Sequence, residues 1–267
     1  MIFSFSPRRV GALILRQLYL YRRSATRALE TIYWPTMDLL LWGFVTIYLQ
    51  RTASKVPMFV SYFIGALILW DLLFRAEQGI SVSFLEDMWA RNLINIFVSP
   101  AGAPEYLLAL MAISALKVVA AFTVTSSLGW IFYSFNIFRL GFSLLPLALD
   151  LVAMGWGIGI FTTALILRYG LEAEILAWAL AFLFLPFSAV FYPVAVLPKA
   201  LRVVASFIPA SYAFEGMRAV IGGGAFPLRQ LAWASGLNAA YLIASTFFFM
   251  HIYKKALARG IIPKIGE

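Results

Sequence analysis

The run YLLALMAISALKVVAAFTVTSSLGWIFYSF at residues 106–135 carries one charged side chain, Lys117. About 20 consecutive apolar residues are enough for a helix to cross the hydrocarbon core of a bilayer, so this run predicts a transmembrane helix. The run is longer than a minimal span, which indicates that the helix is tilted or protrudes from the bilayer. From this helix we expect a helical membrane protein.

The composition agrees with this class. Of 267 residues, 63% are hydrophobic and 12% are charged, and the mean hydropathy is +0.88. A soluble domain would be about 45–50% apolar and about 25% charged, so a single soluble domain is excluded. The absence of cysteine removes thiolate metal sites, and the single histidine, His251, removes nearly every histidine-based one, so we expect no metal site. In a membrane protein the net charge of +9 indicates topology and contact with anionic lipid, not nucleic acid.

Apolar runs and their breaks predict an all-α fold with six transmembrane helices in one domain, residues 32–267. The expected crossings are residues 34–49, 58–74, 106–135, 140–167, 175–195 and 231–253. Prolines, including Pro193, Pro198 and Pro209, interrupt the apolar stretch between the last two crossings. Broken backbone at membrane depth needs protein or a water-filled cavity around it, so we expect re-entrant or outer-leaflet helices there.

Residues 1–31 form a separate segment that predicts an amphipathic helix lying in the membrane interface. At about 100° per residue, Arg9, Arg16, Arg23 and Arg27 share one face, and apolar side chains occupy the other. The segment is too charged to span the bilayer. Its arginines are expected to contact lipid phosphates or a partner protein.

A second short amphipathic helix is expected in the cytoplasm, between the second and third crossings. There Glu86, Asp87 and Arg91 lie among apolar residues such as Trp89, and a Ser-Pro turn with a nearby glycine ends the segment. With the amino terminus inside, thirteen lysines and arginines fall on the cytoplasmic side and seven on the outer side. This bias predicts that both termini are cytoplasmic.

Four ionisable residues lie inside the expected crossings: Asp38, Asp71, Lys117 and Asp150. Such a group at mid-bilayer costs about 2.5–3.5 kcal/mol on insertion scales, so each is expected to face protein or water. Lys117 and Asp150 are the best candidate pair. Lining of a transport path and structural pairing both remain open for these residues.

Glycines recur at positions 155, 157 and 159 of the fourth crossing. Small residues at this spacing let two helices approach closely, either between two copies of the chain or within one.

The most specific motif precedes the last crossing. It reads FYP at residues 191–193, LP at 197–198 and IPASYAFEGMR at 208–218, and includes Pro193, Pro198, Pro209, Glu215 and Arg218. This resembles the "yP…LP…nP…E.R" pattern in permease subunits of type-two ABC exporters, which include O-antigen, teichoic-acid and drug-export permeases. Residues 92–100, NLINIFVSP, stand where that family has a coupling segment. Ile208 replaces the usual Asn, and the common Gly-Thr of the coupling segment is absent.

The resemblance covers essentially the whole chain and implies a non-catalytic permease in the bacterial inner membrane. It implies a homodimer joined to two cytoplasmic ATPase subunits, which would bind ATP and Mg. This chain has no G-x-x-x-x-G-K-[ST] phosphate loop and is expected to hold no cofactor. Movement of the ATPases would pass through Glu86, Asp87, Trp89 and Arg91, with the amino-terminal helix as a second contact. The expected cargo is an amphipathic lipid-linked glycan or glycolipid, with drug or hydrophobic-metabolite efflux as the alternative.

Two other classes compete with export. Ser114 and Lys117 form an S-x-x-K spacing, which places a hydroxyl beside a lysine on one helical face and raises an intramembrane hydrolase as a remote alternative, with Asp150 as a third residue. A channel or secondary transporter would be expected to show internal repeats, and none is convincing between the halves of this chain.

Overall fold

The computed structural model describes residues 5–53 and 59–258. These residues form helices and no strands, so the all-α class is confirmed for them. Within these ranges, four stretches are long and apolar enough to cross a membrane: Ala25–Thr52, Ala103–Tyr133, Ile137–Ala173 and Leu228–Ala258. Some expectations fall on residues outside the described ranges. These residues are position 58 of the expected second crossing, Lys55, Arg259 and Lys264 of the charge comparison, and the outermost residues of both expected domains.

Five long helices run along the molecule: α2 (Ala25–Ala53), α3 (Phe59–Trp89), α5 (Ala103–Tyr133), α6 (Leu144–Tyr169) and α10 (Leu228–Ala258). The other elements are α1 (Pro7–Arg23), α4 (Leu93–Val98), η1 (Ile137–Ser143), η2 (Gly170–Ala173), α7 (Leu176–Phe184), η3 (Val194–Val196), α8 (Lys199–Ala205) and α9 (Pro209–Ile221).

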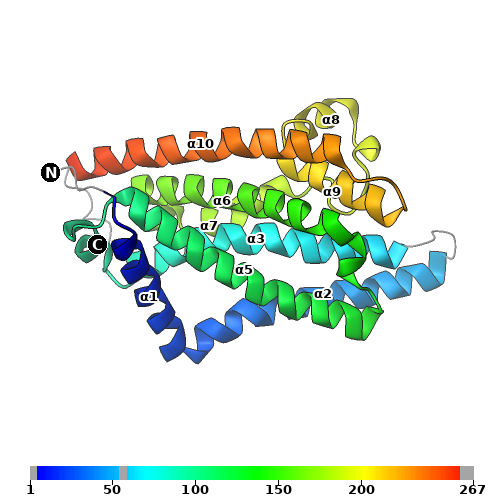
Figure 1. Ribbon diagram of the computed structural model, residues 1–267, viewed down its shortest axis with the longest axis horizontal. Helices are drawn as coiled ribbons and strands as arrows, with labels where there is room; N and C mark the ends of the chain where they lie inside the picture. Colours follow the sequence, from blue (N-terminus) through cyan, green and yellow to red (C-terminus); the bar gives the residue numbers. More distant parts are fainter. Residues whose placement is uncertain (1–4, 54–58, 259–267) are drawn as a thin grey trace.

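The long helices lie side by side, with α3 packed against α2, α5 and α6, and with α10 against α6 (Figure 1). The first and last described residues and α4 lie at one end of the molecule, at the left of Figure 1. The turn at η1, together with α8 and α9, lies at the opposite end. The fold therefore separates the segment 92–100 from the proline-rich motif by the full length of the bundle.

Three expected boundaries were wrong. The single helix expected over residues 1–31 is divided at Ser24, which has extended backbone between α1 and α2. The short helix expected to carry Glu86 and Asp87 is instead the last part of α3, because both carboxylates are paired there and do not interrupt the helix. The fifth expected crossing is reduced to the nine residues of α7, because Pro186 has no backbone N–H with which to continue the helical hydrogen bonds.

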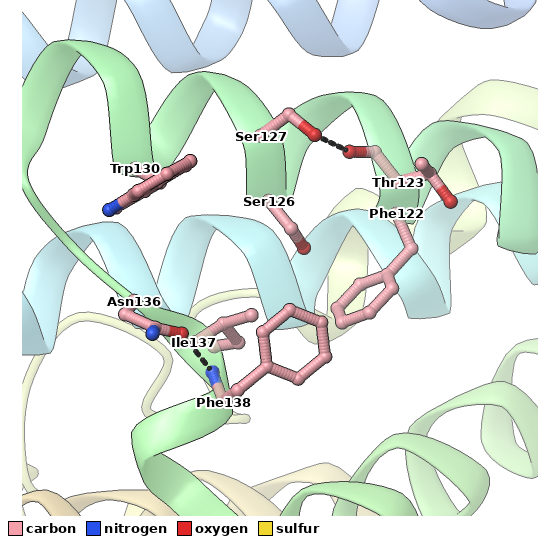
Figure 2. A pocket seen from close by; sticks show the side chains of 8 residues that line it. All are labelled: Phe122, Thr123, Ser126, Ser127, Trp130, Asn136, Ile137 and Phe138. Atoms are coloured by element: carbon pink, nitrogen blue, oxygen red, sulfur yellow. Dashed lines mark hydrogen bonds between the residues drawn. The ribbon is translucent and has the colours of Figure 1, made fainter.

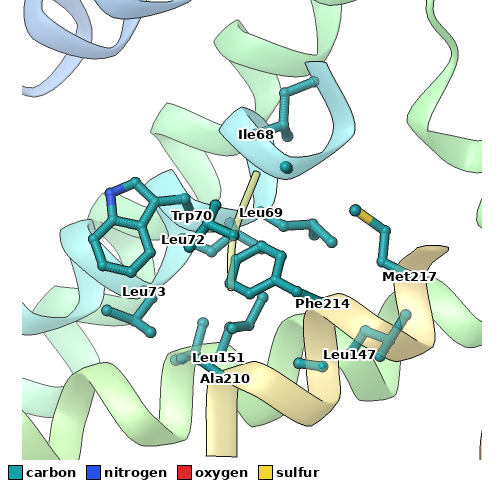
Figure 3. Packing of buried hydrophobic residues seen from close by; sticks show 14 of the residues in the cluster. Ile68, Leu69, Trp70, Leu72, Leu73, Leu147, Leu151, Ala210, Phe214 and Met217 are labelled. Carbon is teal, nitrogen blue, oxygen red and sulfur yellow. The ribbon is translucent and has the colours of Figure 1, made fainter. Parts of the chain in front are cut away.

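Two clusters of buried apolar side chains fill the bundle. At the end near α9, Phe214 is fully buried and points among leucines of α3 and α6, including Leu69 and Leu151 (Figure 3). At the α4 end, Phe84, Tyr106 and Phe249 join α3, α5 and α10. Packing at both ends fixes the spacing of the long helices.

The glycines of α6 serve packing within the chain. A Cβ on Gly155 would overlap the carbonyl oxygen of Leu73 on α3, and a Cβ on Gly159 would lie 2.8 Å from that of Glu77. Gly157 faces α10, where a Cβ would meet ordinary contacts at 3.8 Å or more. The sequence left two roles open for these glycines, contact between two copies of the chain and contact within one. In the structure they take part in contacts within one copy.

This arrangement predicts opposite outcomes for two matched substitutions. Gly155→Ala should destabilise the protein by about 1–3 kcal/mol, because the Leu73 backbone can move only if α3 shifts. Gly157→Ala should be neutral or stabilising by up to about 1 kcal/mol, because alanine is favoured over glycine inside a helix. Thermal unfolding of both variants in one detergent measures the difference. Equal effects of the two changes would contradict the close α3–α6 contact.

Candidate functional site

The face of α1 that carries arginines is bound to α5 and α3 at the α4 end of the bundle. Arg9 donates to Glu105, with Nη2 2.7 Å from Oε1. Glu105 also accepts from the backbone N–H groups of Ser6, at 2.6 Å, and Gly102, at 2.8 Å. The carboxylate thus caps the first turn of α5 and joins α1 to it.

Asp87 is the centre of the second contact. It is 1% exposed and accepts hydrogen bonds from Arg16, from Gln17 Nε2 at 3.3 Å and from Tyr106 Oη at 2.8 Å. A buried carboxylate is stable only when charged and hydrogen-bonding partners satisfy it, and here α1 and α5 both supply them. Asp87 therefore joins three helices.

A third contact lies at the preceding residue of α3. Arg27 Nε is 3.6 Å from Glu86 Oε1, a carboxylate whose side chain is 11% exposed. Nearby, Lys117 donates to Ser83 Oγ at 2.9 Å and lies 4.8 Å from the centre of the Tyr21 ring. Burial, with Glu86 close by, raises the pKa of Tyr21, so its phenol stays neutral beneath the lysine.

Two of the four arginines predicted on one helical face thus meet predicted coupling residues, Arg16 at Asp87 and Arg27 at Glu86. A third, Arg9, meets Glu105 instead. Arg23 is exposed. Sequence reasoning did not select Glu105, Gln17 or Tyr106. A signal for Glu105 existed, because an acidic residue directly after Pro104 is typical of the first turn of a helix.

A cleft of about 300 Å³ opens beside these contacts, between α1, α2, α3, α5 and α7. It combines cations, carboxylates and indole rings: Tyr21, Arg27, Glu30, Trp34, Arg75, Gln78, Glu86, Trp89, Lys117 and Trp178. Arg75 is held by Asp71 Oδ1 at 3.0 Å and Gln78 Oε1 at 2.9 Å. Such a lining suits a molecule with a charged or polar head group and an apolar body.

The other predicted intramembrane residues are separated. Asp38 is on an exposed face of α2. Asp150 accepts from Ser235 at 2.8 Å and from Asn238 at 3.3 Å, both on α10. The predicted pairing of Lys117 with Asp150 is therefore wrong, because each side chain has its own neutral partners on other helices.

Ser114 and Lys117 also have separate partners. Ser114 Oγ donates to the carbonyl of Ala76 at 2.8 Å and accepts from Trp156 Nε1 at 3.0 Å, whereas Lys117 contacts Ser83. The hydroxyl thus has a structural role between α3, α5 and α6. This geometry gives the hydrolase alternative no nucleophile activated by a base.

The proline-rich motif forms a clamp at the opposite end. Glu215 Oε1, on α9, accepts from the backbone N–H of Val194 at 2.7 Å and from Arg218 Nη2 at 3.0 Å. Arg218 Nη1 donates to the carbonyl of Val190 at 3.1 Å. Pro193, Pro198 and Pro209 directly precede or begin η3, α8 and α9. The acidic and basic residues of the motif therefore hold the irregular backbone of residues 190–198.

An exposed surface, here called the α4 face, closes the other end of the molecule. It comprises Trp89, Arg91, Ile94, Asn95 and Val98. Val98 is 81% exposed and Ile94 40% exposed, while Leu93 and Ile96 anchor α4 in the core. Arg91 has a positive φ of 51° at the turn from α3 to α4. Of the four predicted coupling residues, Trp89 and Arg91 are exposed and the two acidic residues are inside.

Comparison with known proteins adds no family assignment. No protein-family model matches the chain, and no curated protein matches it at a significant level. The assignment of function therefore depends on the sites described above and on the sequence motifs.

Proposed function

We propose that this chain is the membrane-spanning subunit of an ATP-driven exporter of the type-two ABC group. In this proposal α2, α3, α5, α6 and α10 each cross the bilayer, and α7 with the irregular segment after it provides the remaining crossing. The observation that carries the proposal is the position of the α4 face. It presents apolar side chains at the end where the described residues begin and end, opposite the proline-rich motif.

The arrangement of the ends supports a cytoplasmic position for both termini. An even number of crossings returns the chain to its starting side, and the described ends lie together with α4. The excess of lysine and arginine assigned to that side favours the cytoplasm. The family resemblance supports the further proposal that this membrane is the bacterial inner membrane.

The α4 face is proposed as the contact with an ATPase subunit, one on each copy of a homodimer. Exposed apolar side chains beside an arginine are typical of a protein interface. ATP and Mg belong to the ATPase in this scheme. Because Asp87 joins the end of α3 to α1 and Glu86 joins it to α2, movement of the α4 face would shift both helices and the cleft beside them.

The proposed cargo is amphipathic, with a lipid-linked glycan or glycolipid first. The mixed charges and indole rings of the cleft support a polar head group on an apolar body. A second candidate, a hydrophobic drug or metabolite, is favoured by a groove of about 420 Å³ between α6, α7 and α10, lined mainly by apolar residues such as Phe161, Leu180 and Phe248.

The proposal is tested by reconstitution with the ATPase encoded beside this chain. The purified chain alone should hydrolyse no ATP, and the two proteins should form a complex of two copies of each. In proteoliposomes that complex should hydrolyse ATP and move a labelled glycolipid. The chain mixed with an unrelated ABC ATPase is the control. A chain that binds no such ATPase, or that moves the lipid without nucleotide, would exclude the proposal.

A further inference from the structure

A second cavity, of about 420 Å³, lies at the far end of α5 from α4, where α5 turns into η1. Figure 2 shows hydroxyl groups on the α5 side and aromatic rings around the opening. Within the described part of the chain, eight side chains line it and none is charged: Phe122, Thr123, Ser126, Ser127, Trp130, Asn136, Ile137 and Phe138. The absence of charge distinguishes this cavity from the cleft beside α1.

The polar groups of the cavity are only partly satisfied. Ser126 is 8% exposed, and its Oγ has no hydrogen-bond partner among the described residues. In Figure 2 this hydroxyl points from α5 toward Phe138. A buried polar atom without a partner is costly, typically about 1–3 kcal/mol, so it indicates a missing ligand or water.

Two donors border the same space. Asn136 Oδ1 accepts from the backbone N–H of Phe138 at 2.9 Å, which fixes the side chain and leaves its amide N–H groups available. The indole N–H of Trp130 makes no hydrogen bond within the described part of the chain, and this side chain is 67% exposed. Thr123 and Ser127 donate to helix carbonyls, and each hydroxyl keeps an acceptor site.

We propose that this cavity binds an uncharged sugar ring of a glycolipid. A sugar presents hydroxyl groups, which can both donate and accept, together with C–H faces that pack on aromatic rings. Hydroxyl, amide and indole groups beside Phe122, Trp130 and Phe138 complement both features. No cation among the described residues lines the cavity, which disfavours a phosphate as the occupant.

The position agrees with a head group. The helix α5 ends at Tyr133, so the cavity lies at the end of a candidate membrane span, where lipid head groups begin. That the bound glycolipid is the exported cargo rests on the proposed function. The binding itself does not require the ATPase.

The test compares lipids that differ only in the head group. The purified chain is incubated in detergent with monoglucosyl diacylglycerol, with diacylglycerol of the same acyl chains, or with phosphatidylglycerol, and retained lipid is measured by native mass spectrometry. The glucosyl lipid should be retained about tenfold better than diacylglycerol, as expected for several hydrogen bonds and ring contacts. Trp130→Leu should reduce retention about threefold to tenfold, and Ser126→Ala about threefold.

Trp233→Leu on α10 is the matched control, because Trp233 is 55% exposed and lies outside the cavity lining. It should retain the glucosyl lipid like the wild type. Equal retention of glucosyl lipid and diacylglycerol, a preference for phosphatidylglycerol, or equal losses in Trp130→Leu and Trp233→Leu would each overturn the sugar site. Retention of glucosyl lipid by a chain that binds no ATPase would support the site and reject only the export proposal.

Discussion

Replacing Asp87 by alanine is expected to release α1 from the bundle and to lower the stability of the protein by about 3–5 kcal/mol. Asp87 is 1% exposed and accepts from Arg16, Gln17 and Tyr106. Its removal leaves the partly buried Arg16 without its carboxylate, and leaves the Tyr106 hydroxyl without its acceptor. Because these partners come from α1 and α5, one substitution weakens two helix contacts.

Thermal unfolding in detergent and limited trypsin digestion together measure this effect. Asp87→Ala should unfold at lower temperature and be cleaved faster in α1, where the arginines at positions 8, 9, 16, 22 and 23 are the possible cleavage sites. Asp87→Asn should show a smaller change, because the amide oxygen still accepts hydrogen bonds. Glu172→Ala, which removes an exposed carboxylate in η2, is the control and should match the wild type. Unchanged digestion of α1 in Asp87→Ala would contradict the proposed attachment.

The sequence predicted the long helices best where apolar residues run without interruption. The crossings expected at residues 106–135 and 231–253 correspond to α5 and α10 within a few residues. The length of α3 was missed because Glu77, Glu86 and Asp87 looked like the end of an apolar span. Asp87 is paired with Arg16 of α1 and Glu86 with Arg27 of α2, and these are tertiary contacts which local patterning does not contain.

The candidate site could be predicted as two sets of residues but not as one site. The arginine face of α1 and the acidic residues of α3 were each selected from local patterns. Their contact joins positions 71 residues apart in the case of Arg16 and Asp87. The direction in which a helix faces its neighbour follows from packing, which local patterns do not contain. The predicted pairing of Lys117 with Asp150 was wrong for the same reason.

The second large effect is expected at the α4 face. Val98→Glu should weaken binding of the ATPase subunit at least about tenfold, since a carboxylate placed in an apolar contact loses water without gaining a partner. Val98 is 81% exposed, so the substitution should leave the fold unchanged. ATP hydrolysis by the reconstituted complex and pull-down of the ATPase measure the loss.

Val196→Glu provides the matched control, because Val196 is 68% exposed but lies in η3 at the opposite end of the bundle. Loss of ATPase binding in Val98→Glu alone would support the contact at α4. An equal loss in both variants would point to a general effect of surface charge, and full binding in Val98→Glu would place the ATPase elsewhere. Asp87→Asn leaves the α4 face intact, so together the variants separate docking of the ATPase from transmission to α1. Val98→Glu should reduce binding of the ATPase, whereas Asp87→Asn should reduce cargo movement while binding stays normal.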